Sequence, residues 1–137
     1  MASIFQLENP VFNRENSSVE LVAASDADTT LTAAQSVNSL VVMTPTGGKD
    51  VTTATAAEIV AELGSGVRIG TTFSITLRNQ AASTHAMTLV GGTGVTLDSD
   101  NTNTAAAAAT RSFLGRVTAI ASGSEAITVY SGVTSAH

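Results

Sequence analysis

Short segments of alternating apolar and polar residues, separated by glycine-rich turns, recur along most of the chain. In TTFSITLRN (71–79) every second residue from Phe73 to Leu77 is large and apolar, and a polar residue lies between each pair. A period of two residues is typical of a β-strand that buries one face. Because strand-like segments return about every eight to fifteen residues, the chain is predicted to fold as a mainly β domain.

Further segments have strand signals and are bounded by turn residues. They are 18–24, 39–44, 85–90, 95–99, 111–120 and 125–131. In 18–24, Val19, Leu21 and Ala23 share one face, and 39–44 is a continuous apolar run that indicates a buried strand. The stretches 91–94 and 121–124 have the length and glycine content of hairpin connections, so each is expected to join two neighbouring strands. In the turn 25–31, Asp26 and Asp28 supply carboxylates that can cap local backbone N–H groups. We therefore expect an antiparallel β-sandwich or jelly-roll-like domain over residues 18–137.

One short α-helix is predicted at 55–64. Thr55 and Glu58 have the spacing of a capping box, in which a hydroxyl and a carboxylate satisfy the first backbone N–H groups. Apolar residues then recur at helical spacing, at Ala56, Ile59, Val60 and Leu63. Gly64 stands where a glycine commonly ends a helix. A helix this short needs a sheet to pack against. By contrast, the alanines of 105–109 lie between Thr and Asn residues, which favours an extended or irregular path.

The composition limits what the surface of this domain can be. Charged residues make up 12% of the chain, compared with roughly 25% in an average soluble domain. The exterior must be built largely from Thr, Ser and Ala, which lose little hydration when another protein covers them. We therefore expect copies of the same chain to cover much of it. A hydroxyl-rich β domain that simply faces water is the alternative.

Several functional classes are disfavoured by composition. Six basic residues against eleven acidic ones give a net charge of −5, without the basic stripe of a nucleic-acid-binding protein. The absence of cysteine excludes disulfides, thiolate zinc sites and a cysteine nucleophile. The longest apolar run, 105–109, is far shorter than the roughly 20 residues that span a bilayer. The N-terminus has neither the basic nor the long apolar region of a signal peptide.

Residues 1–17 are predicted to form an extended N-terminal arm. Pro10 and three asparagines interrupt any regular period, and two of the four phenylalanines lie in this segment. The candidate partner-binding residues of the arm are its large apolar side chains, Ile4, Phe5, Leu7, Val11 and Phe12. Either the arm docks on a neighbouring protein, or it is a first strand that covers its own domain.

Candidate catalytic and metal-binding groups are few. His85 could act as a general base, but no G-x-S-x-G motif or suitably spaced Asp accompanies it, so no catalytic residue is assigned and no enzyme is expected. The oxygen-rich segment 98–101 begins like a calcium loop but lacks the glycine and the glutamate that complete one. We interpret it as a turn and expect no metal and no cofactor. Tyr130 is the single tyrosine and tryptophan is absent, which disfavours sugar binding.

The order of motifs over residues 30–131 resembles a domain of small tailed-phage virion structural proteins. The residues that carry the resemblance are LTAAQ (31–35), TAAEIVAELG (55–64), GTTFSITLRNQ (70–80), TLVGGTGVTL (88–97) and RSFLGRVTAIASGSEAITVYS (111–131). The resemblance does not extend to the N-terminal arm. In that family no catalytic residues are defined, so none are carried over.

The resemblance implies a capsid decoration, or cement, protein. Such a protein is made in the host cytoplasm, binds the major capsid protein shell on the virion exterior and forms a homotrimer. Neither nucleic acid nor membrane is then expected as a partner. A host-receptor or glycan-binding module of a phage fibre is the alternative interpretation.

Overall fold

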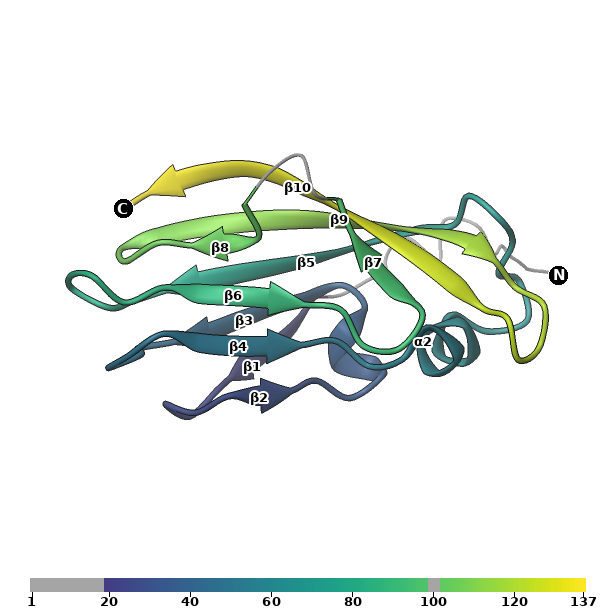
Figure 1. Ribbon diagram of the computed structural model, residues 1–137, viewed down its shortest axis with the longest axis horizontal. Coiled ribbons are helices and arrows are strands. Elements are labelled where there is room, and N and C mark those ends of the chain that lie inside the picture. Colours follow the sequence, from purple (N-terminus) through teal and green to yellow (C-terminus); the bar gives the residue numbers. More distant parts are fainter. Residues whose placement is uncertain (1–18, 99–101) are drawn as a thin grey trace, which may run out of the picture.

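The computed structural model describes residues 19–98 and 102–137, which form two β-sheets with a short helix at one end (Figure 1). The six-stranded sheet has the order β1 (Glu20–Ala23), β3 (Ser39–Met43), β5 (Thr72–Asn79), β9 (Ala109–Ala119), β10 (Ala126–Ala136) and β7 (Val95–Leu97). The four-stranded sheet has the order β2 (Thr29–Thr30), β4 (Lys49–Thr52), β6 (Met87–Val90) and β8 (Thr104–Ala105). A 3-10 turn, η1 (Ala34–Ser36), and the helix α2 (Ala56–Leu63) complete the described elements.

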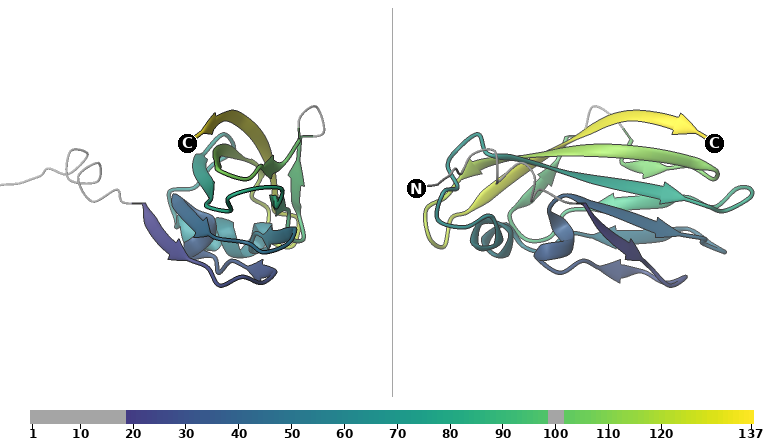
Figure 2. Two further views of the ribbon diagram at one scale, coloured as in Figure 1. Left: turned by 90° about the vertical axis from the view of Figure 1, so that its left-hand side faces the viewer. Right: turned by 180° about the vertical axis from the view of Figure 1, so that it is seen from behind.

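The hydrophobic core lies between the inner faces of the two sheets (Figure 2). The six-stranded sheet contributes alternate residues such as Ile75, Leu77 and Phe113, and the four-stranded sheet contributes Val51 and Leu89. All five side chains are almost completely buried. The prediction of a mainly β, sandwich-like domain with one short helix is therefore confirmed.

The pairing of strands is mixed, so the prediction of an antiparallel sandwich is wrong in this respect. The parallel pairs are β1–β3, β3–β5, β2–β4, β4–β6 and β7–β10, whereas β5–β9, β9–β10 and β6–β8 are antiparallel. From β1 to β9, successive strands alternate between the two sheets. Each crossing between the sheets reverses the direction of the chain, so two crossings bring it back to the first sheet in its original direction. Strands that become neighbours in this way are parallel.

The two predicted hairpins have different outcomes. Residues 121–124 do connect the antiparallel neighbours β9 and β10. Residues 91–94 instead carry the chain from β6 in one sheet to β7 in the other, so this hairpin prediction is wrong. A Cβ at Gly92 would lie 2.6 Å from the backbone oxygen of Thr53, and Gly94 has a φ of +82°. The glycines thus allow a close crossing between the sheets.

The helix α2 agrees with its sequence signals. The Thr55 hydroxyl accepts a hydrogen bond from the Glu58 N–H at 3.2 Å, and the Glu58 carboxylate accepts one from the Thr55 N–H at 3.0 Å. Gly64 ends the helix with a φ of +89°. Ile59 is fully buried, which anchors the helix at one end of the sandwich (Figure 1). The irregular path predicted for 105–109 is also confirmed, since β8 ends at Ala105 and β9 begins at Ala109.

Candidate functional site

His85 lies in the loop before β6, and its contacts there are structural. Its backbone oxygen accepts a hydrogen bond from the side-chain amide of Asn79 at 2.8 Å. Asn79 is completely buried, donates also to the Ala105 oxygen at 2.9 Å, and accepts from the Ala81 N–H at 2.9 Å. Among the described residues, no carboxylate or hydroxyl side chain hydrogen-bonds to the His85 imidazole. Asn79 therefore ties this loop to β8.

The oxygen-rich segment 98–101 lies largely outside the described residues, which include only Asp98. In residues 19–98 and 102–137 no group of three or more His, Asp or Glu side chains could hold a metal ion. Across the same ranges no helix has both the length and the apolar character needed to cross a membrane.

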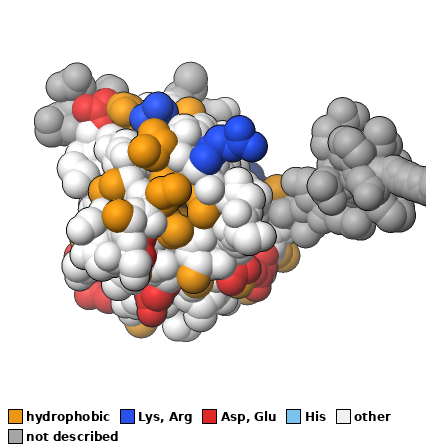
Figure 3. Space-filling view, turned by 90° about the vertical axis from the view of Figure 1, so that its right-hand side faces the viewer, with side chains coloured by type: hydrophobic (Ala, Val, Ile, Leu, Met, Phe, Trp, Pro, Cys, Tyr) orange, Lys and Arg blue, Asp and Glu red, His pale blue; other side chains and the backbone are white. Residues whose placement is uncertain are grey.

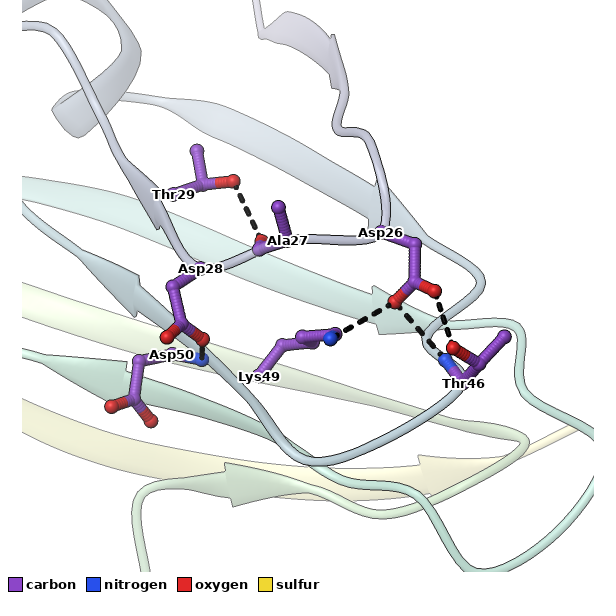
Figure 4. A network of polar contacts seen from close by, with 7 residues as sticks. All are labelled: Asp26, Ala27, Asp28, Thr29, Thr46, Lys49 and Asp50. Carbon is purple, nitrogen blue, oxygen red and sulfur yellow. Dashed lines mark hydrogen bonds and ion pairs between the residues drawn. The ribbon is translucent and has the colours of Figure 1, made fainter.

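Carboxylates at one end of the sandwich join two loops (Figure 4). Asp26, between β1 and β2, accepts hydrogen bonds from the hydroxyl and the N–H of Thr46 and lies 3.5 Å from the Lys49 ammonium. The Thr46 hydroxyl, the Thr46 N–H and Lys49 together lower the pKa of Asp26 below its usual value. Asp28 accepts from the Asp50 N–H at 2.9 Å. The prediction that these aspartates cap local N–H groups is wrong, because the N–H groups that they accept from, of Thr46 and Asp50, lie 20 and 22 residues further along the chain.

The outer face of the six-stranded sheet carries an unusual set of apolar side chains. We call this surface the sheet face and define it by Leu21, Leu40, Val42, Leu114 and Tyr130. Leu21 is 65% exposed, Leu114 48% and Tyr130 40%, while Leu40 and Val42 are partly exposed. Leu21 is paired in register with Leu40, and Leu114 with Tyr130. The outward residues of β5 between these two groups are polar, since Thr76 is paired with Leu40 and Ser74 with Leu114. Large exposed apolar residues rimmed by polar ones commonly mark a protein-contact surface.

Polar groups on the sheet face are hydroxyls and guanidinium groups. Thr76 and Ser112 lie opposite each other in the centre of the sheet, with their hydroxyl oxygens 3.2 Å apart. Arg78 on β5 and Arg116 on β9 also occupy outward positions. Among the described strand residues, no Asp or Glu shares these outward positions. A surface without carboxylates on a chain of net charge −5 is suited to a neutral or acidic partner surface.

Sequence reasoning missed the sheet face, although its residues were visible. In 18–24, Val19, Leu21 and Ala23 share one face, and the structure places Val22 toward the core and Leu21 outward. The run 39–44 indicated a buried strand, yet only alternate residues of β3 are buried. Both segments have apolar residues on both faces of the strand, and this pattern was the signal that could have predicted an exposed apolar surface.

The arm residues predicted to bind a partner lie outside the described residues. They are Ile4, Phe5, Leu7, Val11 and Phe12. The described chain begins at Val19, directly before β1, and β1 is an edge strand of the six-stranded sheet. Residues 1–18 thus precede an edge strand of the sheet that carries the sheet face.

Comparison of the chain with family models, with curated proteins and with solved structures found no match.

Proposed function

We propose that this chain is a non-enzymatic capsid decoration protein, which binds and stabilises the assembled head shell of a tailed phage from outside. The order of motifs over residues 30–131 supports this proposal through its resemblance to small virion structural proteins. The observation that carries it is the sheet face, where Leu21, Leu114 and Tyr130 are exposed beside hydroxyls and arginines. The partners proposed are the major capsid protein and sister copies in a homotrimer.

The proposed stabilising role follows from the coupling between binding of this protein and assembly of the shell. A protein that binds the assembled shell but not its separated subunits shifts the equilibrium toward the shell by mass action. Many copies act on one particle, so each individual contact can be modest. Apolar and hydroxyl side chains suit such contacts because covering them removes few strongly held waters.

The experiment that tests the proposal uses phage heads that lack the chain. Purified full-length protein is expected to co-sediment with the heads and to raise the temperature at which they release their contents. A variant without residues 2–13 should keep the melting temperature of the domain and bind the heads poorly, because the apolar arm supplies anchors. Equal binding by the truncated variant would contradict the role of the arm, and absence of binding by the full chain would contradict the decoration function.

A host-receptor or glycan-binding module of a fibre is the competing outcome of the same experiment. That function would be indicated if the full chain failed to bind heads but bound host cells or immobilised glycans.

A further inference from the structure

The six-stranded sheet has an open edge on each side. On one side the edge strand is β1, which pairs only with β3. On the other side β7 covers β10 at Ile127–Val129, and among the residues that the structure describes no further strand covers the rest of β10 on this side. A bulge between Ser131 and Thr134 separates the covered part of β10 from residues 134–136. These three residues are exposed and carry neither charge nor proline, the features that often keep an edge strand from pairing.

The two open edges lie at the same level of the sheet and run in the same direction. One row of outward residues is paired in register from edge to edge: Ala23, Val42, Arg78, Thr110 and Ser135. The strands β1, β3 and β5 are parallel, and the two antiparallel steps to β9 and to β10 cancel, so β10 is parallel to β1. Both strands run away from the end that carries α2 (Figures 1 and 2). Ala23 and Ser135 are both exposed.

The backbone of β1 alternates between β3 and the open edge. Glu20 lies opposite Ser39, and its N–H donates to the Asn38 oxygen at 2.9 Å, so in this parallel ladder a residue bonds to the neighbours of the residue opposite it. The Ala24 N–H likewise donates to β3 at 2.9 Å. Even-numbered residues of β1 therefore bond to β3, and the N–H and C=O of Ala23 point to the open edge.

The backbone of β10 alternates in the same way beyond its bulge. The His137 N–H donates to the Ala108 oxygen at 2.7 Å, next to the registered pairs of β9 and β10. His137 and Ser135 therefore direct their backbone groups to β9. Thr134 and Ala136 direct theirs to the open edge, because successive residues of a strand bond to opposite sides.

We propose that β1 of a second copy of this chain pairs in parallel with the open part of β10, with Ala23 opposite Ser135. In the ladder pattern of β1 and β3, the Ala23 N–H then donates to the Thr134 oxygen, and the Ala136 N–H donates to the Ala23 oxygen. These are the groups that point to the two open edges. A second copy fits because its edge matches in direction, in outward face and in the alternation of backbone groups.

The contact joins different edges of the two copies, so it repeats head to tail and can close into a ring. It rests on the homotrimer of the proposed function, in which three such contacts close the ring, and it does not depend on shell binding. Because strands pair edge to edge, the outer face of each sheet stays open to the shell. Leu21, which is 65% exposed, lies two residues before Ala23 and is brought against the neighbouring copy.

Chemical cross-linking of the full chain tests this contact, because the chain has no cysteine of its own. The double variant Ala23→Cys with Ser135→Cys places one thiol on each edge. Within one chain four strand spacings separate these thiols, which is about 19 Å, too far for a short bismaleimide to join. The reagent should instead link neighbouring copies, and covalent dimers and trimers are expected on a denaturing gel.

Two kinds of control define which edges meet. Each single cysteine variant alone should give no linked chains, because the contact joins unlike edges. The matched double variant is Ala23→Cys with Ser122→Cys, which should also give none. Ser122 is exposed in the turn between β9 and β10, at the α2 end of the molecule, away from both open edges. Figure 3 shows that end, where hydrophobic, basic and acidic side chains are all exposed.

Ala23→Pro tests the backbone hydrogen bonds of the same contact. Proline removes the N–H that donates between copies and no N–H that bonds within the chain, a position where edge strands tolerate it. Light scattering should give the wild type the mass of three chains and this variant one third of that mass. Ala23→Ser keeps the N–H and should keep the wild-type mass. Melting temperatures identify any variant that fails to fold, and the cross-linking result then decides.

The proposed contact is overturned if the Ala23→Cys and Ser135→Cys double variant gives no linked chains or gives products larger than trimers. It is also overturned if a single cysteine variant links to itself, or if folded Ala23→Pro keeps the wild-type mass. Co-sedimentation with phage heads is measured separately. A protein that forms linked trimers but does not bind heads would contradict the decoration function and leave this contact standing.

Discussion

The two sheets share one core but differ on their outer faces. On the four-stranded sheet the outward positions hold mainly Thr and Asp, in registered pairs such as Thr30 with Thr52 and Asp50 with Thr88. On the six-stranded sheet the corresponding positions include Leu114 and Tyr130, which are paired in register and exposed. The period of two residues is therefore the same in both sheets, whereas the chemistry of the outward positions is not.

The difference indicates that the two faces meet different surroundings. Asp50 and the threonines of the four-stranded sheet hold water through charge and hydroxyl groups, so covering them costs hydration free energy. Leu114 and Tyr130 gain free energy when they are covered. We interpret the four-stranded sheet as the side that faces water and the sheet face as the side that contacts protein in the proposed assembly.

The largest expected effect is on binding, after substitution of the paired residues on the sheet face. Leu114→Asp combined with Tyr130→Asp should weaken binding to phage heads by about 100-fold or more, because central contact residues each contribute about 2 kcal/mol or more. Titration of heads by co-sedimentation measures the dissociation constant. The matched control is Thr52→Asp with Thr88→Asp on the other sheet, which should bind as the wild type does. An equal loss of head binding in both double variants would contradict the assignment of binding to the sheet face alone.

Asn79→Ala should lower the stability of the domain without changing which face binds. The substitution leaves the His85 and Ala105 oxygens and the Ala81 N–H without their buried partner. Loss of these hydrogen bonds is expected to reduce the free energy of unfolding by about 2 to 3 kcal/mol. Urea unfolding followed by circular dichroism measures it, with Gln80→Ala at the adjacent exposed position as control. An unchanged denaturation midpoint would show that Asn79 does not hold the sheets together.

Thr55→Ala tests the helix end and is expected to have a smaller effect. It removes the hydroxyl that accepts from the Glu58 N–H, and such a loss typically costs about 1 kcal/mol. Thermal unfolding measures the change, and Thr55→Ser should retain most of the stability because it keeps the hydroxyl. If alanine and serine at position 55 gave the same melting temperature, the capping box would not stabilise this end.

The smallest expected effect concerns pH and the loop contacts of Asp26. Because folding lowers the pKa of this carboxyl below 3.8, the stabilisation is fully present above that value. It is lost as the pH falls through the lower pKa of the folded state. The difference in melting temperature between the wild type and Asp26→Asn should therefore shrink as the solution is acidified below pH 3.8. A difference that stays constant with pH would argue against the role of the charged form.

Local features of the fold could be predicted from the sequence, whereas the association of strands could not. The capping box at Thr55 and the hairpin at 121–124 depend on residues close in the chain, and both formed as predicted. The glycines of 91–94 reverse the chain equally well within a sheet or between sheets, so the crossing from β6 to β7 had no local signal.

The sheet face could not be predicted from the sequence for a related reason. A period of two shows which residues share a face but not which face meets the core, as Leu21 and Val22 illustrate. Both are apolar, and the pairing of β1 with β3, which places Val22 beside the buried Val41, determines that Val22 points inward. The predicted arm residues remain a prediction, since they lie outside the described residues.

Tyr130 allows the most direct test that the sheet face is covered by protein in the particle. When hydroxyl radicals modify the protein, mass spectrometry of the peptides can assign the oxygen added to this residue, the single tyrosine of the chain. Its modification rate should fall when the chain binds heads, because a partner that covers the exposed ring excludes the radical from it. An equal rate in the free and head-bound chain would contradict the assignment of this face as the binding surface.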